Sequence, residues 1–252
     1  MLTVVYVLVS TEKDYFYEQF LVSLTSLRYR MSEVNVILLI EQDTNQYIQT
    51  KHKEINELVE QIIVHELPAE YSMVARSRIL KTMMRQLVNG DFLYIDCDTV
   101  ICSSLEDIQK VQYSSAVLDN HCEVTEQIVE FIPVMKRAER FGFSVGYQNK
   151  HFNGGVLWCK DDKKTREFFE QWNMTWNETY KKGIMIDQLS FNEVNNRMEG
   201  TFSEISGEWN CQLRYGLPYL SDAKIIHYFA SNFNNNLSEA QFAYKFTKGE
   251  IL

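Results

Sequence analysis

Short apolar runs alternate with helix-like segments along the first part of the chain, and this alternation restricts the chain to few folds. The runs TVVYVLV and VNVILLI are rich in β-branched residues and almost continuously apolar, which is typical of strands covered on both faces. Strands are expected at 3–9, 34–40, 62–67 and 92–96, and helices at 14–30, 47–61 and 72–88. Such an alternation predicts an α/β fold with a mainly parallel sheet, right-handed crossovers and flanking helices.

The alternation weakens after residue 98. Further strands are expected at 114–119, 152–159 and 224–229, and further helices at 163–176 and 184–198. Residues 121–151 show no clear period and are expected to form an excursion over the sheet. Since the chain contains no internal repeat, low-complexity tract or linker, one domain over 1–252 is the simplest expectation.

The composition argues against some functions and compartments. A formal net charge of −9 argues against a broad nucleic-acid-binding surface, which needs clustered positive charge, but it is compatible with a small anionic ligand. The five cysteines lack CxxC spacing and indicate neither a disulfide framework nor a zinc ribbon. The apolar opening run is too short to cross a bilayer and lacks the basic region of a signal peptide. We therefore expect a cytoplasmic protein without a transmembrane segment.

The fourth apolar run ends in two carboxylates. The segment FLYIDCD places Asp96 and Asp98 at the carboxyl end of a strand, where sheets of this kind bind ligands. Residues i and i+2 of an extended chain point to the same side, roughly 6.5–7 Å apart, so the two acids could share a divalent cation. Oxygen ligands suit Mg²⁺ or Mn²⁺. An acidic turn or helix cap is the simpler alternative.

Other polar residues follow or interrupt predicted elements. His227 in KIIHYF is either a buried core histidine or a further metal ligand, and an imidazole would favour Mn²⁺ over Mg²⁺. Gly154 and Gly155 in FNGGVLW indicate either the close approach of a ligand or backbone, or a simple bulge, and Asn153 can bind hydroxyl groups. Asp187, at the start of a predicted helix, is either a site carboxylate or a helix cap.

These motifs occur in the order and approximate spacing of the family 8 glycosyltransferases. The chain resembles that family from about residue 3 to residue 231, through RSRILKTMMRQLVNGDFLYIDCDTVICSSLEDI, FNGGVLWC, DQLSFN, EWN and IIHYF. The resemblance implies a GT-A-type Rossmann-like fold, with a nucleotide-binding half of about 1–105 and an acceptor- and sugar-facing half of about 106–252. It also implies that a hexose is moved from a nucleotide-diphosphate sugar, typically a UDP-sugar, to a glycan or lipid-linked hydroxyl acceptor, with retention. A lipid-linked acceptor is compatible with peripheral contact at the inner face of a membrane.

The resemblance further implies roles for individual residues. Asp96, Asp98 and His227 resemble the protein ligands of a Mn²⁺ or Mg²⁺ ion, and Asp96 would also face the ribose of the donor. The other residues implied to contact the nucleotide or sugar are Ser10, Thr11, Asn153, Gly154 and Gly155. The residues implied to act at the transferred sugar are Arg78, Asp187 and Gln188. Because no side chain is an obvious nucleophile, front-face displacement is the preferred mechanism.

The segment after His227 departs from the family pattern. Family members commonly continue with a Lys-Pro-Trp-like segment whose lysine holds the diphosphate, whereas HYFASNFNNN contains neither lysine nor proline. Backbone N–H groups, asparagines, or a lysine such as Lys245 or Lys248 would have to take its place. This departure leaves open a nucleotide-sugar- or glycan-binding protein of the same fold without activity.

A phosphatase of the haloacid dehalogenase type is the second alternative. FLYIDCDTV also fits its strand followed by D-x-D-x-T/V, in which the first aspartate, here Asp96, is the nucleophile. Asp161 and Asp162 could imitate its later acidic motif. However, that nucleophile normally lies near the start of its domain, and the phosphatase would leave FNGG, DQLSFN and His227 without roles. The sequence favours the transferase.

Overall fold

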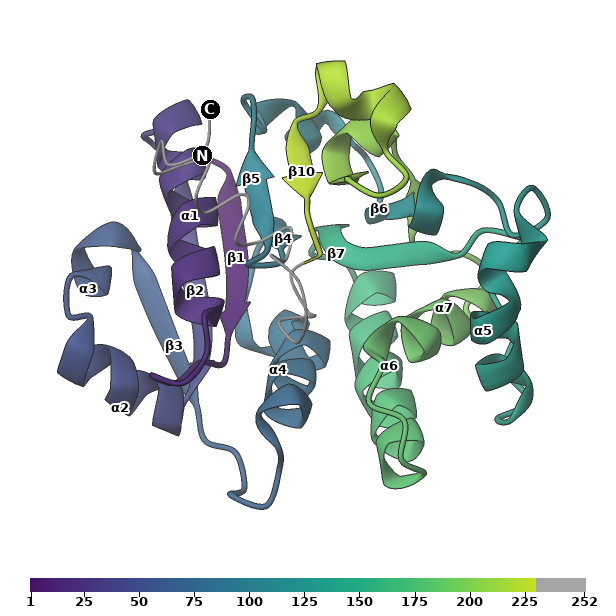
Figure 1. Cartoon of the computed structure of the whole chain (residues 1–252), viewed down its shortest axis with the longest axis horizontal. Helices are drawn as coiled ribbons and strands as arrows, with labels where there is room; N and C mark the ends of the chain where they lie inside the picture. Colours follow the sequence, from purple (N-terminus) through teal and green to yellow (C-terminus); the bar gives the residue numbers. More distant parts are fainter. Residues whose placement is uncertain (230–252) are drawn as a thin grey trace.

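Seven strands form the central sheet of the computed structural model, which describes residues 1–229 (Figure 1). They are β1 (Thr3–Leu8), β2 (Asn35–Glu41), β3 (Gln61–His65), β4 (Phe92–Ile95), β6 (Ser115–Leu118), β7 (Phe152–Cys159) and β8 (Ser203–Glu204). Their order is β3-β2-β1-β4-β7-β6-β8. The strands from β3 to β4 pair in parallel, whereas β7 runs antiparallel to both neighbours. The predicted α/β fold with a mainly parallel sheet is confirmed.

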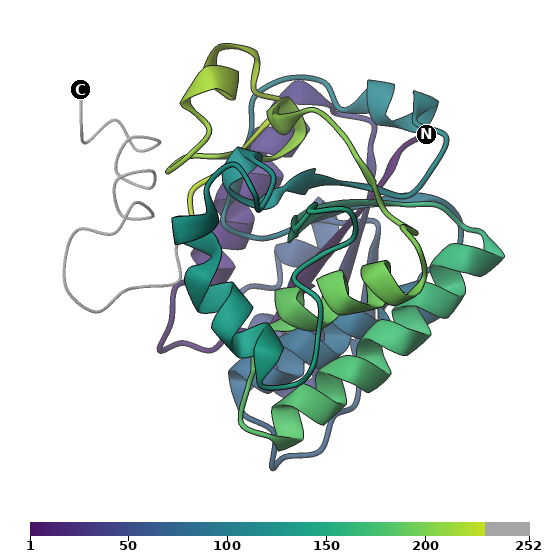
Figure 2. The same ribbon diagram turned by 90° about the vertical axis from the view of Figure 1, so that its right-hand side faces the viewer.

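Helices cover both faces of this sheet. The α-helices are α1 (Phe16–Arg30), α2 (Gln42–Lys51), α3 (Ile55–Leu58), α4 (Met73–Leu87), α5 (Ile128–Glu139), α6 (Lys163–Lys181) and α7 (Asp187–Arg197). Four 3-10 helices join later elements: η1 (Glu106–Lys110), η2 (Asp119–His121), η3 (Gly207–Asn210) and η4 (Leu217–Asp222). In Figure 2, α4, α6 and α7 lie together on one side of the sheet. None of the helices within residues 1–229 has the length and apolar character that a membrane span requires.

Alternate residues of each strand supply two separate cores. Val4 and Tyr6 of β1 pack on the α1 side, with Phe20 of that helix, whereas Val5 and Val7 pack on the side of α4, α6 and α7. This division follows from the period of two in a strand, which sends successive side chains to opposite faces. It also explains why the predicted strands lack alternation of apolar and polar residues, since both faces are buried.

A second, three-stranded sheet closes one end of the molecule. It has the order β5-β10-β9 and consists of β5 (Thr99–Ile101), β10 (Ile225–His227) and β9 (Cys211–Gln212). The antiparallel pairing of β10 with β5 sets His227 directly opposite Thr99. Since β5 follows the acidic pair immediately, this pairing carries the last described strand back to the end of β4. The strand predicted at 224–229 is correct in place but shorter.

The helix predicted at 47–61 is wrong in its bounds. The chain instead forms α2 from Gln42 and the short α3, with a break at His52. The side chain of Glu41 accepts hydrogen bonds from the backbone N–H groups of Asp43 and Thr44 and so begins the helix five residues early. Glutamate is an uncommon residue for this cap, which is why sequence reasoning overlooked the start.

The segment 121–151 contains a helix that its sequence did not reveal. Phe131 and Ala138 of α5 are buried, seven positions apart on one face. Apolar Ile128 and Val129 of the same helix are exposed, so the apolar pattern does not follow the buried face. Pro133 lies inside the helix and weakens the helical signal further.

Candidate active site

The acidic pair lies where the large sheet passes into the small one. Asp96 follows the last residue of β4, and its backbone N–H donates to the carbonyl oxygen of Gly155 at 2.8 Å. The carbonyl oxygen of Asp98 accepts from the N–H of Tyr228 at 3.1 Å. The side chains of Asp96 and Asp98 are 22% and 20% exposed, so both carboxylates reach the surface from a fixed backbone.

His227 joins this pair, although more than a hundred residues separate it from the aspartates in the sequence. Its Nε2 atom lies 3.2 Å from Oδ1 of Asp98, and one ligand atom from each of Asp96, Asp98 and His227 falls within 4.8 Å of the others. Burial alone would lower the pKa of His227, but the negative charge of Asp98, the hydrogen bond to Asp98 and the charge of Asp96 together outweigh burial and raise the pKa. The expected convergence of two carboxylates and one imidazole is therefore present.

Two cations of α4 lie beside the acids, of which Lys81 is buried and Arg78 is half-buried. Arg78 places Nε 3.0 Å from Oδ1 of Asp187, and Lys81 places Nζ 3.3 Å from both Asp187 Oδ2 and Asp96 Oδ1. Burial would raise the pKa of Asp187, but the charges of Arg78 and Lys81 hold it below its ordinary value. Ile186 holds the N-cap position of α7, and Asp187 makes no side-chain cap, so the cap alternative for Asp187 is wrong.

The paired glycines of β7 lie against these groups. A Cβ atom on Gly155 would come within 2.3 Å of Cε1 of His227, so this position has no room for a side chain. A Cβ atom on Gly154 would make only ordinary contacts, the nearest at 3.6 Å from Nζ of Lys81. The N–H of Gly154 donates to Oε1 of Gln188 at 3.4 Å, which draws Gln188 toward the strand. Close approach is found at Gly155, but it is that of the His227 imidazole and not of a ligand or backbone. The register of β7 with β6 also shifts between Leu157 and Phe152, around both glycines, so the bulge alternative is supported as well.

Ser10 and Thr11 form hydrogen bonds within the protein. The hydroxyl of Ser10 donates to Asp14 at 2.6 Å, and the N–H of Thr11 donates to the same carboxylate at 2.8 Å. Ser10 is fully buried. Neither residue lines the hollows described next, so the structure does not bring them to the acidic pair.

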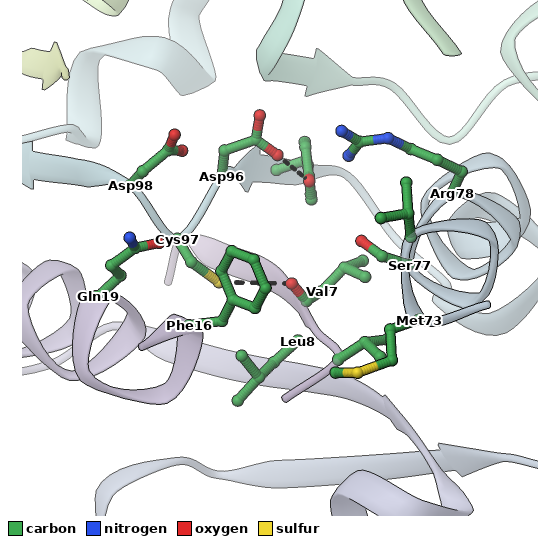
Figure 3. Close-up of a pocket in the computed structure, with 13 residues that line it drawn as sticks. Val7, Leu8, Phe16, Gln19, Met73, Ser77, Arg78, Asp96, Cys97 and Asp98 are labelled. Carbon is green, nitrogen blue, oxygen red and sulfur yellow. Dashed lines mark hydrogen bonds between the residues drawn. The ribbon is translucent and has the colours of Figure 1, made fainter. Parts of the chain in front are cut away.

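Two hollows meet at the acidic pair. The first, of about 300 Å³ and here named the apolar hollow, lies between α1 and α4 above the end of β1. Figure 3 shows Phe16 of α1 and Met73 of α4 on its two sides, with Asp96 and Asp98 at its rim. The second, of about 360 Å³ and named the polar hollow, is lined by Lys81, Asp187 and Gln188. Arg78, Asp96 and Asp98 line both, so one extended ligand could occupy the two hollows across the acids.

Comparison with known proteins decides which family this arrangement represents. Residues 6–232 match the family model described as glycosyl transferase family 8. The chain belongs to this family. As a family 8 glycosyltransferase it is an enzyme of glycosyl transfer, and the resemblance inferred from the motifs is confirmed. No curated protein sequence matches the chain significantly.

Solved structures of several glycosyltransferases share the fold of this family 8 member. The galactosyltransferase LgtC, solved with donor and acceptor sugar analogues, aligns with a TM-score of 0.64 at 16% identity, covering 99% of this chain and 96% of its own. Mouse xyloside xylosyltransferase 1 aligns with a TM-score of 0.58 at 12% identity, covering 90% and 97%. GlyE of Streptococcus pneumoniae aligns with a TM-score of 0.61 at 16% identity, covering 98% and 61%. At these identities the likeness shows a common GT-A fold.

The phosphatase alternative is contradicted by the family match and also by the positions of Asp161 and Asp162 in this family 8 enzyme. Asp161 and Asp162 follow β7 at the end that pairs with Phe92, the opposite end of β4 from Asp96. Asp161 accepts from the N–H of Gly90, and Asp162 caps α6. Both therefore stabilise loops away from the acidic pair.

Sequence reasoning overlooked three residues of the family 8 site. Lys81 lies one helical turn after Arg78, so its i, i+3 spacing was the available signal. Asn210 of η3 belongs to the EWN motif of the resemblance but was given no role, and no local pattern identifies Asp119 of η2. Lys245 and Lys248, considered for the diphosphate, lie outside the described residues.

Proposed function

We propose that this enzyme transfers a hexose from a UDP-sugar or similar nucleotide-diphosphate sugar to a hydroxyl group of a glycan or lipid-linked acceptor, with retention and with a bound Mn²⁺ or Mg²⁺ ion. The observation that carries the proposal is the meeting of Asp96, Asp98 and His227 at the boundary between the apolar and polar hollows. The nucleoside would occupy the apolar hollow of the 1–105 half, and the sugar would occupy the polar hollow, between the two halves.

The donor set fits the proposed ion. Two carboxylates and one imidazole offer hard oxygen ligands together with a nitrogen that Mn²⁺ accepts more readily than Mg²⁺ does. When bound, such an ion would supply positive charge against the negative charge that develops on the diphosphate leaving group. The residues that would hold it are already fixed by strand pairing and by the contact of Gly155 with His227.

Side chains of the polar hollow would handle the transferred sugar. Arg78 and Lys81 carry fixed positive charge next to the acids and so could bind sugar hydroxyls or a phosphate oxygen. Asp187 is 6% exposed and paired with both cations, which makes its carboxylate a poor nucleophile. Gln188 is neutral. Because Asp187 is paired and Gln188 is neutral, attack of the acceptor on the same face as the departing diphosphate is the preferred route, and it retains the anomeric configuration.

The acceptor would enter beside α5. Val134 and Arg137 of this helix line the polar hollow opposite the acidic pair. An apolar and a cationic side chain on that wall suit the body and the polar groups of a sugar. The acceptor would therefore meet the donor sugar within the polar hollow, where proximity and exclusion of water favour transfer.

A thermal-shift panel of nucleotide sugars with and without Mn²⁺ tests the proposal. Binding to the native state raises the melting temperature by mass action, and a ligand at a hundredfold its Kd should raise it by about 5–10 °C in a domain of this size. We expect the rise only with Mn²⁺ present. Transfer is then read from release of the nucleoside diphosphate in the presence of candidate acceptors.

Two variants sharpen this test. Asp98→Ala should lose the Mn²⁺-dependent part of the shift while keeping its own folding transition. Asp222→Ala, which removes an exposed carboxylate of η4, should keep the full shift. A Mn²⁺-dependent shift without turnover on any acceptor would instead support the inactive sugar-nucleotide-binding alternative. An unchanged shift in Asp98→Ala would contradict the metal role.

A further inference from the structure

A chain of buried amides connects the imidazole of His227 with the carboxylate of Asp119. Nδ1 of His227 lies 3.1 Å from Oδ1 of Asn210. Nδ2 of Asn210 donates to Oδ1 of Asn153 at 2.9 Å, and Nδ2 of Asn153 donates to Oδ1 of Asp119 at 2.9 Å. The N–H of Gly155 also donates to Oδ1 of Asn153 at 2.9 Å. Asn210 is fully buried and Asn153 is 4% exposed, so water is not available to replace these partners.

The two ends of this chain determine its direction. A backbone N–H only donates, so Gly155 requires the oxygen of Asn153 on its side, and the ionised carboxylate of Asp119 only accepts, so it requires the Asn153 amide nitrogen. The oxygen of Asn153 must then receive the amide nitrogen of Asn210. This arrangement leaves the oxygen of Asn210 facing His227, and that oxygen can accept a hydrogen bond but cannot donate one.

We propose that Asn210 is a positioning residue that keeps a proton on Nδ1 of His227 and thereby presents Nε2 as the nitrogen for the divalent ion. The inference rests on the proposed metal role of His227 and deepens it by naming the group that orients this ligand. A carbonyl-type oxygen behind a metal-binding imidazole fixes both its tautomer and its ring orientation.

The opposite tautomer of His227 would not fit this series of hydrogen bonds. Without a proton on Nδ1, the imidazole nitrogen and the oxygen of Asn210 would face each other as two acceptors. Turning over the Asn210 amide would only move the conflict to Asn153, whose oxygen Gly155 holds in place. Asp98 competes from the other side, because its Oδ1 lies 3.2 Å from Nε2 and favours a proton on Nε2, from which it accepts a hydrogen bond in the metal-free protein. A bound ion would displace the Nε2 proton, whereas the proton on Nδ1 of His227 would remain, donated in a hydrogen bond to Oδ1 of Asn210.

Metal affinity measured without donor or acceptor tests the role of Asn210. Asn210→Leu, which has similar volume but no acceptor, should weaken Mn²⁺ binding about 10–100-fold in calorimetry. Asn210→Asp keeps an acceptor oxygen toward Nδ1 but sets its second oxygen against Oδ1 of Asn153, so it should recover part of the affinity at a cost in stability. Asn195→Leu is the matched control, because Asn195 is also buried but its amide binds only the backbone of Phe202. This control should keep wild-type affinity in spite of any loss of stability.

Nitrogen-15 NMR of the histidine rings tests the tautomer directly, with the His227 signals assigned by their absence in His227→Gln. In the Zn²⁺-loaded protein we expect a proton on Nδ1 and none on Nε2. A proton found on Nε2, or unchanged Mn²⁺ affinity in folded Asn210→Leu, would overturn the proposal. If the wild-type protein binds neither Mn²⁺ nor Zn²⁺, the proposed metal role of His227 is wrong, and the role of Asn210 must be tested without an ion. The metal-free spectrum at alkaline pH then decides, since a proton on Nδ1 supports the role of Asn210 and a proton on Nε2 alone refutes it.

Discussion

At the scale of single residues, Gly155 makes room for His227. A side chain there would overlap the imidazole, since its Cβ would lie 2.3 Å from Cε1 and 2.7 Å from Nδ1. The neighbouring Gly154 lacks this constraint, although both glycines belong to the same fully buried strand. Glycine is therefore required at position 155, because of its contact with His227, and not at position 154.

Gly155→Ala should consequently displace the imidazole and weaken Mn²⁺ binding by at least about tenfold, the range seen when the surroundings of a metal ligand are disturbed. Calorimetry with Mn²⁺ alone measures this change. Gly154→Ala adds the same methyl group one residue earlier, where it makes only ordinary contacts, and should retain wild-type metal affinity. Equal affinities for the two variants would show that the close contact at His227 has no effect on the ion.

Lys81 is the buried cation that bridges the carboxylates of Asp96 and Asp187. Its side chain is 3% exposed and lies between Asp96 and Asp187. Lys81→Met should lower the free energy of unfolding by about 3 kcal/mol, because it removes one of the two cationic partners of the buried Asp187 carboxylate and the cation beside Asp96. Urea denaturation at neutral pH gives the value. Lys110→Met, at an exposed ion pair with Asp107, should leave stability unchanged, and a similar loss in both variants would contradict the role of burial.

At the scale of elements, α4 carries both cations and must begin at the correct residue. The hydroxyl of Ser72 accepts a hydrogen bond from the N–H of Ala75 at 3.2 Å and caps the helix. Met84 and Leu80, further along α4, pack into the core on the α6 and α7 side. The cap thus fixes the register in which Arg78 and Lys81 face the site.

Ser72→Ala should lower the free energy of unfolding by about 1 kcal/mol, the typical cost of a lost N-cap. Ser72→Asp keeps an acceptor oxygen at the same place and should remain within a few tenths of the wild-type value. Both are measured by thermal or urea denaturation. If the aspartate variant lost as much stability as the alanine variant, the cap would not be the source of the effect.

At the scale of the whole molecule, one sheet separates two cores and holds the site at its edge. Phe20 belongs to the core on the α1 side and Phe168 to the core on the α6 and α7 side, and both are fully buried. Because every central strand contributes side chains to both cores, loss of either core should remove support from the other. Such mutual dependence of the two cores is what the expectation of one domain requires.

Phe20→Ala and Phe168→Ala should each lower the free energy of unfolding by about 3–5 kcal/mol. In each variant, far-UV circular dichroism and tryptophan fluorescence should report one coincident transition, as in cooperative unfolding. Trp209 reports on the first core, and Trp172 and Trp176 on the second. Two separated transitions would instead divide the chain into independent units.

The sequence by itself determined the strands that are buried on both faces. The runs at 3–9, 34–40 and 92–96 are apolar almost throughout, so local composition was enough to predict β1, β2 and β4. It also predicted that Asp96 and Asp98 lie at the end of a strand, because strand period and strand end are local properties. The segment of α5 was not predicted, because its exposed isoleucine and valine residues obscure the buried face.

Only the tertiary structure decided which distant groups meet the acids. The pairing of β10 with β5 places His227 beside Asp98, and the packing of α4 and α7 places Lys81 between Asp96 and Asp187. The direction of the amide chain likewise depends on Gly155 and Asp119, which come from different elements. These contacts join residues far apart in the chain, and local patterns carry no information about them, since long-range pairing depends on the packing of the whole sheet.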